Sequence, residues 1–219
     1  MINNRINKLV SKFKKYDIDG YIVPKNDEFF SEYSANDRLK TISNFSGSAG
    51  YSIILKKKNY LFVDGRYTIQ AKKEAGNNFQ IIDFHKIINC NLFKNLSIGF
   101  DPKLFTSIQI KKFFHKNNKV KSIESNLIDQ IHQHKIKLNK PFYSLKTKVV
   151  GGNYKTKIIK IRKYLNKNKS DYLFITAPEN IAWLLNIRGH DNPNSPIPNC
   201  QLIIDDKNSF YLITYKNKV

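Results

Sequence analysis

The block Val63-Asp64-Gly65-Arg66-Tyr67 places a carboxylate and a guanidinium close together in the chain. It follows an apolar run that predicts a strand and precedes a helical pattern over 66–75. Polar residues at strand ends commonly line clefts. Asp64 is suited to cap the helix by accepting hydrogen bonds from first-turn amides. Arg66 could bind an anion or a peptide, or could only pair with a neighbouring carboxylate, and the spacing alone leaves both readings open.

A second charged block, Asp37-Arg38-Leu39, follows Glu32-Tyr33 in a polar stretch, 27–45, that is predicted to be mostly helical. Taken by itself, this pattern indicates a surface helix with an exposed charge pair. Such pairs contribute little to stability.

A third block, Phe45-Ser46-Gly47-Ser48-Ala49-Gly50, is rich in small residues and leads into a predicted hairpin. It is not a phosphate-binding loop, because a strand follows it instead of a helix and no Lys-Ser or Lys-Thr pair closes it. Small residues let two backbone segments approach closely, so the block predicts tight packing at a strand start.

The fourth block runs from Ile181 to Gly189 and contains the chain's single Trp, Trp183. Its apolar pattern predicts a buried helix that ends at an Arg-Gly turn, with Trp183 in the core.

The sequence offers no set of residues for metal-assisted or nucleophilic catalysis. The spacing of the five histidines is not that of a metal site: His85, His115, His132, His134 and His190. Hydrolysis by two metal ions would require several carboxylate and His ligands around one point. Neither a nucleophile elbow nor a zincin motif occurs. We therefore predict no catalytic residue and no metal ligand in this chain.

Strand patterns alternate with helical ones along the chain, which predicts an α/β fold. Residues 2–16, 107–116 and 179–186 are predicted helices, and 79–84 and 97–100 are predicted strands. The pattern then repeats at an offset of about 150 residues, with hairpins at 52–63 and 202–214. We expect a first domain over 1–125, a linker over 126–153, and the start of a related, truncated second domain over 154–219.

The net charge of +21 raises the question of nucleic-acid binding. Only five of the 38 cationic residues are Arg, and the Lys residues are spread along the chain instead of clustering on one element. Readers of specific DNA sequences rely on Arg for bidentate contacts. A compositional bias towards Lys, Asn and Ile explains the charge better, and we expect no specific nucleic-acid partner.

Cys90 and Cys200 are too few and too far apart for a disulfide scaffold or a zinc site. The polar, helical start of the chain does not have the pattern of a signal peptide. No apolar run approaches the roughly 20 residues needed to span a bilayer. We therefore expect a cytoplasmic protein with no membrane partner.

Together, the blocks resemble the long, three-domain Xaa-Pro aminopeptidases in order and spacing over essentially the entire chain. The blocks that carry the resemblance are Tyr21-Ile22-Val23-Pro24, Glu32-Tyr33, Asp37-Arg38, residues 45–50, Asp64-Gly65-Arg66-Tyr67 and Ala182 to Gly189. The resemblance implies two tandem creatinase/prolidase N-terminal domains with a ribonuclease H-like topology, the second of them incomplete. This fold agrees with the internal repeat.

The resemblance also implies a function for the whole enzyme. In similar enzymes a C-terminal domain holds two divalent metal ions, usually manganese, and removes an N-terminal residue that precedes proline. The Arg that Arg66 matches holds the peptide substrate there, and Asp64, Gly65, Tyr67, Asp37 and Arg38 are expected to support it. The implied partners are a proline-containing peptide and the C-terminal catalytic domain, with homodimerisation left open. The alternative is a stand-alone binding module that keeps the fold without catalysis.

Overall fold

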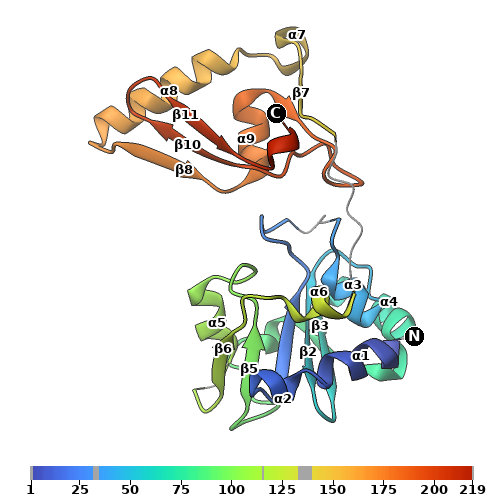
Figure 1. The fold of residues 1–219 in the computed structure, drawn as a ribbon. Helices are drawn as coiled ribbons and strands as arrows, with labels where there is room; N and C mark the ends of the chain where they lie inside the picture. Colours follow the sequence, from blue (N-terminus) through green and yellow to red (C-terminus); the bar gives the residue numbers. More distant parts are fainter. Residues whose placement is uncertain (1, 32–34, 115, 133–139, 219) are drawn as a thin grey trace. The chain divides into compact units, whose positions relative to one another are not determined.

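The computed structural model describes residues 2–31, 35–114, 116–132 and 140–218 (Figure 1). These residues form two compact units, which are described separately below. The first unit contains the described residues from 2 to 132, apart from Ala35, and the second contains residues 140–218.

The first unit is built on a six-stranded sheet with the order β4-β3-β2-β1-β5-β6. The strands are β1 Gly20–Pro24, β2 Gly50–Leu55, β3 Asn59–Val63, β4 Gln80–Asp83, β5 Ser97–Phe100 and β6 Lys119–Ser122. Only the β1–β2 and β2–β3 pairs are antiparallel; β3–β4, β1–β5 and β5–β6 are parallel. Five strands therefore run in one direction, and their carboxyl ends meet at one edge of the sheet.

Helices cover both faces of this sheet, so the first unit has two apolar clusters. Its helices are α1 Ile2–Val10, α2 Phe13–Tyr16, α3 Arg38–Ser43, α4 Thr68–Ala75, α5 Ser107–Phe113 and α6 Leu127–Ile131, with short 3-10 turns η1 Gly65–Tyr67, η2 Gly76–Asn78 and η3 Phe84–Ile87. One cluster joins α1, α3, α4 and α6 to one face. The other face is covered by side chains between Phe84 and Phe114, including those of α5.

The second unit contains a three-stranded antiparallel sheet with the order β11-β10-β8. Its elements are β7 Tyr143–Ser144, α7 Thr147–Val150, α8 Tyr154–Lys167, β8 Tyr172–Ile175, α9 Pro178–Leu185, β9 Ile187–Arg188, β10 Gln201–Asp205, β11 Phe210–Ile213 and η4 Lys216–Lys218. The helices α8 and α9 pack against one face and form a single apolar cluster with Leu202 and Ile204 (Figure 1).

Both predicted hairpins are confirmed, and the α/β class is also confirmed. The predicted helix over 27–45 is mostly wrong, because among the described residues of this range, 27–31 and 35–45, only Arg38–Ser43 is helical. The side chain of Asp27 accepts hydrogen bonds from the amides of Phe29 and Ser31, both at 2.9 Å. These local bonds satisfy the backbone without a helix.

The segment predicted as a linker, 126–153, contributes to both units. Leu127 and Ile128 of α6 are fully buried in the first unit. In the second unit, β7 pairs with β9. Because α6 is only five residues long, its sequence is too short to show a helical periodicity.

The prediction that Trp183 lies in the core is wrong, because its side chain is 63% exposed. Its neighbours Ile181, Ala182, Leu184 and Leu185 are buried, so the inward face of α9 is complete without it. The ammonium of Lys157 lies 4.3 Å from the Trp183 ring centroid in a cation–π contact.

Candidate functional site at the carboxyl edge of the first sheet

The polar blocks of the first unit lie at the edge where five strands end. The block that begins with Asp64 follows β3, Lys25 follows β1, and Asp101 follows β5. The small-residue block, residues 45–50, leads into β2 at the same edge because β2 is antiparallel to its neighbours. In open α/β sheets, ligands bind beyond the carboxyl ends of the strands. The topology thus brings separate sequence blocks to one candidate site.

Asp64 caps the turn η1, as its position predicted. Its Oδ1 accepts from the Arg66 amide at 3.0 Å and from the Arg66 Nε at 2.8 Å. The hydrogen bond from the Arg66 side chain, together with that from its amide, holds the pKa of Asp64 below its ordinary value. Arg66 therefore does pair with a neighbouring carboxylate, which was one of the two readings of the sequence.

This pairing leaves most of the Arg66 side chain at the surface. The side chain is 76% exposed, and its guanidinium carbon lies 5.6 Å from the Tyr67 ring centroid. A guanidinium has five N–H donors in a planar fork, and Nε is the atom that contacts Asp64. The second reading, a role in binding an anion or a peptide, is therefore compatible with the geometry.

Tyr67 connects this turn to the small-residue block. Its hydroxyl is 2.9 Å from Ser48 Oγ, and its ring meets the Phe45 ring edge-on at 5.8 Å between centroids. A Cβ on Gly47 would lie 2.2 Å from the Phe45 ring, so a larger residue would displace the ring. The prediction of tight packing at this strand start is confirmed.

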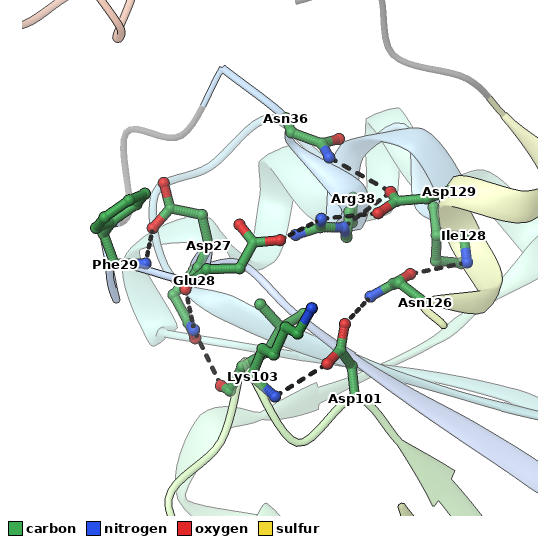
Figure 2. A network of polar contacts seen from close by, with 12 residues as sticks. Asp27, Glu28, Phe29, Asn36, Arg38, Asp101, Lys103, Asn126, Ile128 and Asp129 are labelled. Atoms are coloured by element: carbon green, nitrogen blue, oxygen red, sulfur yellow. Dashed lines mark hydrogen bonds and ion pairs between the residues drawn. The ribbon is translucent and has the colours of Figure 1, made fainter. Parts of the chain in front are cut away.

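Arg38 is not on the surface, and the prediction of an exposed charge pair is wrong. The Arg38 side chain is 4% exposed. Its Nε and Nη2 donate to the two oxygens of Asp129 at 2.9 and 2.8 Å, and Nη2 also donates to Glu28 Oε1 at 2.6 Å (Figure 2). Asp37 caps α3 by accepting from the Lys40 amide at 2.9 Å, and it pairs with Lys25.

The electrostatics of Arg38 follow from these contacts. Burial opposes its charge, but the hydrogen bonds to Asp129 and Glu28 outweigh this cost and raise the pKa of Arg38 above its ordinary value. Its Nη1 is buried and has no hydrogen-bond partner among the described residues. Breaking this network would leave charges without partners in a largely buried place, so its first role is to hold α3, α6 and the 25–31 loop together.

A second part of the network satisfies Asp101, which is almost fully buried. Its carboxylate accepts from Asn126 Nδ2 at 2.8 Å and from the Lys103 amide at 2.9 Å (Figure 2). Sequence reasoning missed Glu28, Asp101, Asn126 and Asp129. Their partners are mostly distant in the chain, and no local pattern marks them.

The carboxylates of this edge do not make a metal site. Across residues 2–31, 35–114, 116–132 and 140–218, no group of three or more His, Cys, Asp or Glu side chains could hold a metal ion. His115 and His134 lie outside the described residues. The carboxylates that the fold brings together are paired with Arg38, Arg66, Lys25, Asn126 or backbone amides, so they do not fit a metal centre.

The structure places all six predicted site residues at one edge of the sheet. Arg66 follows β3 and Arg38 begins the helix after β1, with β2 between these strands. Strands two positions apart are separated by roughly 10 Å. The Arg66 side chain is largely exposed, whereas that of Arg38 is buried and contacts Glu28 and Asp129. The arrangement can bind an acceptor group of a ligand.

No helix within the described part of the chain is both long enough and apolar enough to cross a membrane.

Comparison with known proteins identifies the family of both units. Residues 5–131 and residues 133–219 match two family models, each described as "Creatinase/Prolidase N-terminal domain". The two matches agree with the internal repeat in the sequence.

Similar curated proteins are named as Xaa-Pro aminopeptidases. The chain is 31% identical over 209 residues to "Probable Xaa-Pro aminopeptidase P" of Laccaria bicolor, covering 88% of this chain and 33% of that protein. It is 30% identical over 220 residues to "Xaa-Pro aminopeptidase 1" of Dictyostelium discoideum, covering 90% and 35%. The chain thus spans about one third of the length of these relatives, in their N-terminal portion.

Among solved structures, the X-prolyl aminopeptidase of Caenorhabditis elegans matches with a TM-score of 0.87 and 26% identity. The match covers 100% of this chain and 40% of that one, which is described as a cytosolic enzyme with a di-nuclear active site. A backbone match over the entire chain supports the fold of both units.

Proposed function

Because the chain belongs to the creatinase/prolidase N-terminal domain family, we propose that it is the non-catalytic N-terminal portion of a metal-dependent Xaa-Pro aminopeptidase. In this role the chain supplies part of the wall of a substrate cleft and contacts for assembly. The substrate class is a peptide with proline in the second position. The observation that supports this most strongly is the match of the whole chain to the N-terminal portions of proteins bearing that name.

We assign different roles to this chain and to the C-terminal catalytic domain because of the side chains that this chain provides. The described residues provide no ligand set for two metal ions, so we assign no catalytic step to them. The metal ions, when bound in the C-terminal catalytic domain, would supply the hydrolytic chemistry. The role that we assign to this chain is recognition of the peptide through the largely exposed guanidinium of Arg66.

Arg66 is the residue to which we assign substrate contact. Its planar fork of donors suits a peptide carbonyl or carboxylate, and an ammonium group cannot reproduce that geometry. Asp64 orients it through the 2.8 Å contact to Nε, and Tyr67 packs beneath it. Asp37 and Arg38 act through the fold, because they hold the 25–31 loop and α3 in place.

The test is a covalent chimera in which this chain replaces the matched part of the Caenorhabditis elegans enzyme. We expect the chimera to release the N-terminal residue of an X-Pro peptide, and Arg66→Lys to lower kcat/KM. The loss of a charged hydrogen bond costs about 1.5–3 kcal/mol, or roughly tenfold to a hundredfold in kcat/KM.

The matched control is the reverse exchange, Lys56→Arg, at the opposite edge of the sheet. Lys56 Nζ pairs with Asp19 Oδ1 at 2.9 Å, and both groups are exposed. This variant should keep full activity.

If Arg66→Lys lowered the melting temperature and left kcat/KM unchanged, Arg66 would be only a salt-bridge partner. A well-folded but inactive chimera would favour a stand-alone binding module.

The description of the worm relative as cytosolic supports a cytoplasmic location for the protein, which we retain as part of this proposal.

A further inference from the structure

Lysine residues that are spread along the sequence come together at the amino edge of the first sheet, where five strands begin. The turn between β2 and β3 and the short helix α2 also lie at this edge (Figure 1). The exposed lysines in its turns, helix ends and strand starts are Lys14, Lys15, Lys56, Lys57, Lys58, Lys72, Lys94 and Lys119. Adjacent strands lie about 4.8 Å apart, so six strands give a row of lysines roughly 24 Å long.

Most carboxylates of the first unit lie at the opposite edge, at or beyond the carboxyl ends of the strands. They are Asp27, Glu28, Asp37, Asp64, Asp83, Asp101, Glu124 and Asp129. At the amino edge the described carboxylates are Asp17 and Asp19, which pair with Lys121 and Lys56. A compositional bias explains how many lysines the chain has, but it does not explain why opposite charges collect at opposite edges of one sheet.

One end of the row of lysines is hollowed by a cavity of about 760 Å³, between the β2–β3 turn and the end of α4. Its described lining includes three exposed lysines, Lys57, Lys58 and Lys72, and contains no carboxylate. None of these three ammonium groups has an ion-pair partner among the described residues. Like charges around one cavity repel each other, and an anion bound between them would remove that repulsion.

The local sequence builds this cavity through Gly76 and Asn59. The helix α4 ends at Gly76, whose φ of +59° lies in the left-handed region that favours glycine. The chain then turns back towards the hairpin, where Asn59 Nδ2 donates to the carbonyl oxygen of Asn78 at 3.0 Å. A Cβ on Gly76 would have no heavy atom within 4 Å, so the turn requires the glycine and the space does not.

The side chains of this edge suit phosphate groups better than nucleic-acid bases. An ammonium group binds phosphate oxygens as a point charge, in charge-assisted hydrogen bonds. Proteins that bind single-stranded nucleic acid add aromatic rings on which the bases stack. At this edge the rings of Tyr60 and Phe79 are buried, and the ammonium group of Lys15 lies 5.5 Å from the centroid of the half-buried Tyr16 ring.

We propose that the amino edge of the first sheet binds a linear chain of phosphate groups without bases, inorganic polyphosphate. The cavity at Lys57, Lys58 and Lys72 is its tightest subsite. An extended chain fits better than a single phosphate, because the lysines continue along the edge from β3 to β6. The site lies at the edge opposite Arg66, so binding there does not require the substrate contact assigned above.

The test is isothermal titration calorimetry of the full chain with a linear inorganic polyphosphate long enough to span the row. We expect binding at physiological ionic strength, with an affinity that falls as the salt concentration rises. A single-stranded oligonucleotide and a polyglutamate with the same number of negative charges should bind at least about tenfold more weakly. Bound polyphosphate should slow amide hydrogen exchange in residues 56–59 and 76–80.

A triple variant removes the ammonium groups of the cavity: Lys57→Gln, Lys58→Gln and Lys72→Gln. It should weaken the binding of polyphosphate at least about tenfold. The slope of log affinity against log salt concentration should become shallower by about three, since each lysine that contacts phosphate contributes about one.

The matched control removes three exposed lysines of α8 in the second unit: Lys155→Gln, Lys163→Gln and Lys167→Gln. Both triple variants lower the net charge by the same amount, but the control should change the affinity by less than about twofold. Thermal denaturation should show that both variants fold, because all six side chains are exposed.

Three results would overturn the proposal: no binding of polyphosphate, an equal loss of affinity in the two triple variants, or equal or tighter binding of the oligonucleotide or the polyglutamate. An equal loss would show that net charge alone attracts the polyanion. Tighter binding of the oligonucleotide would assign the edge to nucleic acid, and tighter binding of polyglutamate would assign it to an acidic protein.

Discussion

The two units use the same central hairpin and strand, but they differ in what surrounds it. In the first unit the β3-β2-β1 core lies within a six-stranded sheet that has an apolar cluster on each face. In the second unit the β11-β10-β8 core is the entire sheet, and the described residues form one cluster, on the side of α8 and α9. A repeated strand pattern therefore fixes which faces are apolar without fixing which faces are packed.

The largest expected difference in stability comes from replacing a tyrosine by alanine in each of the two sheets, Tyr60 in β3 and Tyr211 in β11. Tyr60 is 3% exposed, so Tyr60→Ala should leave a cavity and lower the free energy of unfolding by about 3–5 kcal/mol. Tyr211→Ala should change it by less than about 0.5 kcal/mol, because Tyr211 already faces solvent. Urea denaturation of both variants measures the difference. Equal losses would show that the two faces are packed alike.

Next in size is the loss of the Arg38 network. Arg38→Met removes a buried guanidinium and leaves Asp129 and Glu28 without their partner, which should cost roughly 3 kcal/mol. Partial exposure of the two carboxylates limits the cost. Arg66→Met is the matched control and should change stability by under about 0.5 kcal/mol. Chemical denaturation measures both, and an Arg38→Met protein of unchanged stability would contradict a structural role for this network.

A smaller difference is expected in the exchange of backbone amides. Strands β1, β2 and β3 are packed on both faces, whereas β8, β10 and β11 are packed on one. Opening of the second sheet should therefore cost at least about 1.4 kcal/mol less, which is a tenfold lower protection factor. Native-state hydrogen exchange measures this, and equal protection in both units would remove the contrast between them.

The smallest effect concerns pH. Hydrogen bonds from Lys56 Nζ, and then from the Ser97 amide, lower the pKa of Asp19 below its ordinary value of 3.8. A carboxyl group with a lowered folded-state pKa stabilises the protein above its unfolded pKa and loses this effect as pH falls through the folded pKa. Asp19→Asn should therefore cost under about 1 kcal/mol at pH 7 and nothing at pH 2. Melting temperatures at both pH values test this, and a difference that persisted at pH 2 would contradict it.

Local patterns predicted the parts of the fold that local interactions determine. The hairpins were predictable because short polar turns separate alternating apolar runs, as at Asp205–Asn208. The cap formed by Asp64 was predictable because its acceptor lies two residues from the donor. In contrast, the burial of Arg38 depends on Asp129, 91 residues away in the chain. Nothing in the immediate sequence of either residue marks that contact.

Trp183 and Asp27 show two further reasons why the sequence alone did not predict the local structure correctly. Around Trp183 the helix is apolar on several sides, so its pattern does not reveal which side faces solvent. Asp27 lies in a stretch of helix-compatible composition, yet its side chain binds two backbone amides and stabilises a turn. The role of Arg66 in peptide binding remains a prediction from resemblance.

The position of β1 in the middle of the first sheet also has a kinetic consequence. Its antiparallel partner β2 lies within about 35 residues along the chain, but its parallel partner joins Gly20 to Ile98, 78 residues apart. The farthest pairing in the β11-β10-β8 sheet joins Tyr172 to Asp205, 33 residues apart. Chain closure over longer separations slows folding. The hairpins should form first in both units, and the docking of β5 onto β1 should be the slow step that completes the first.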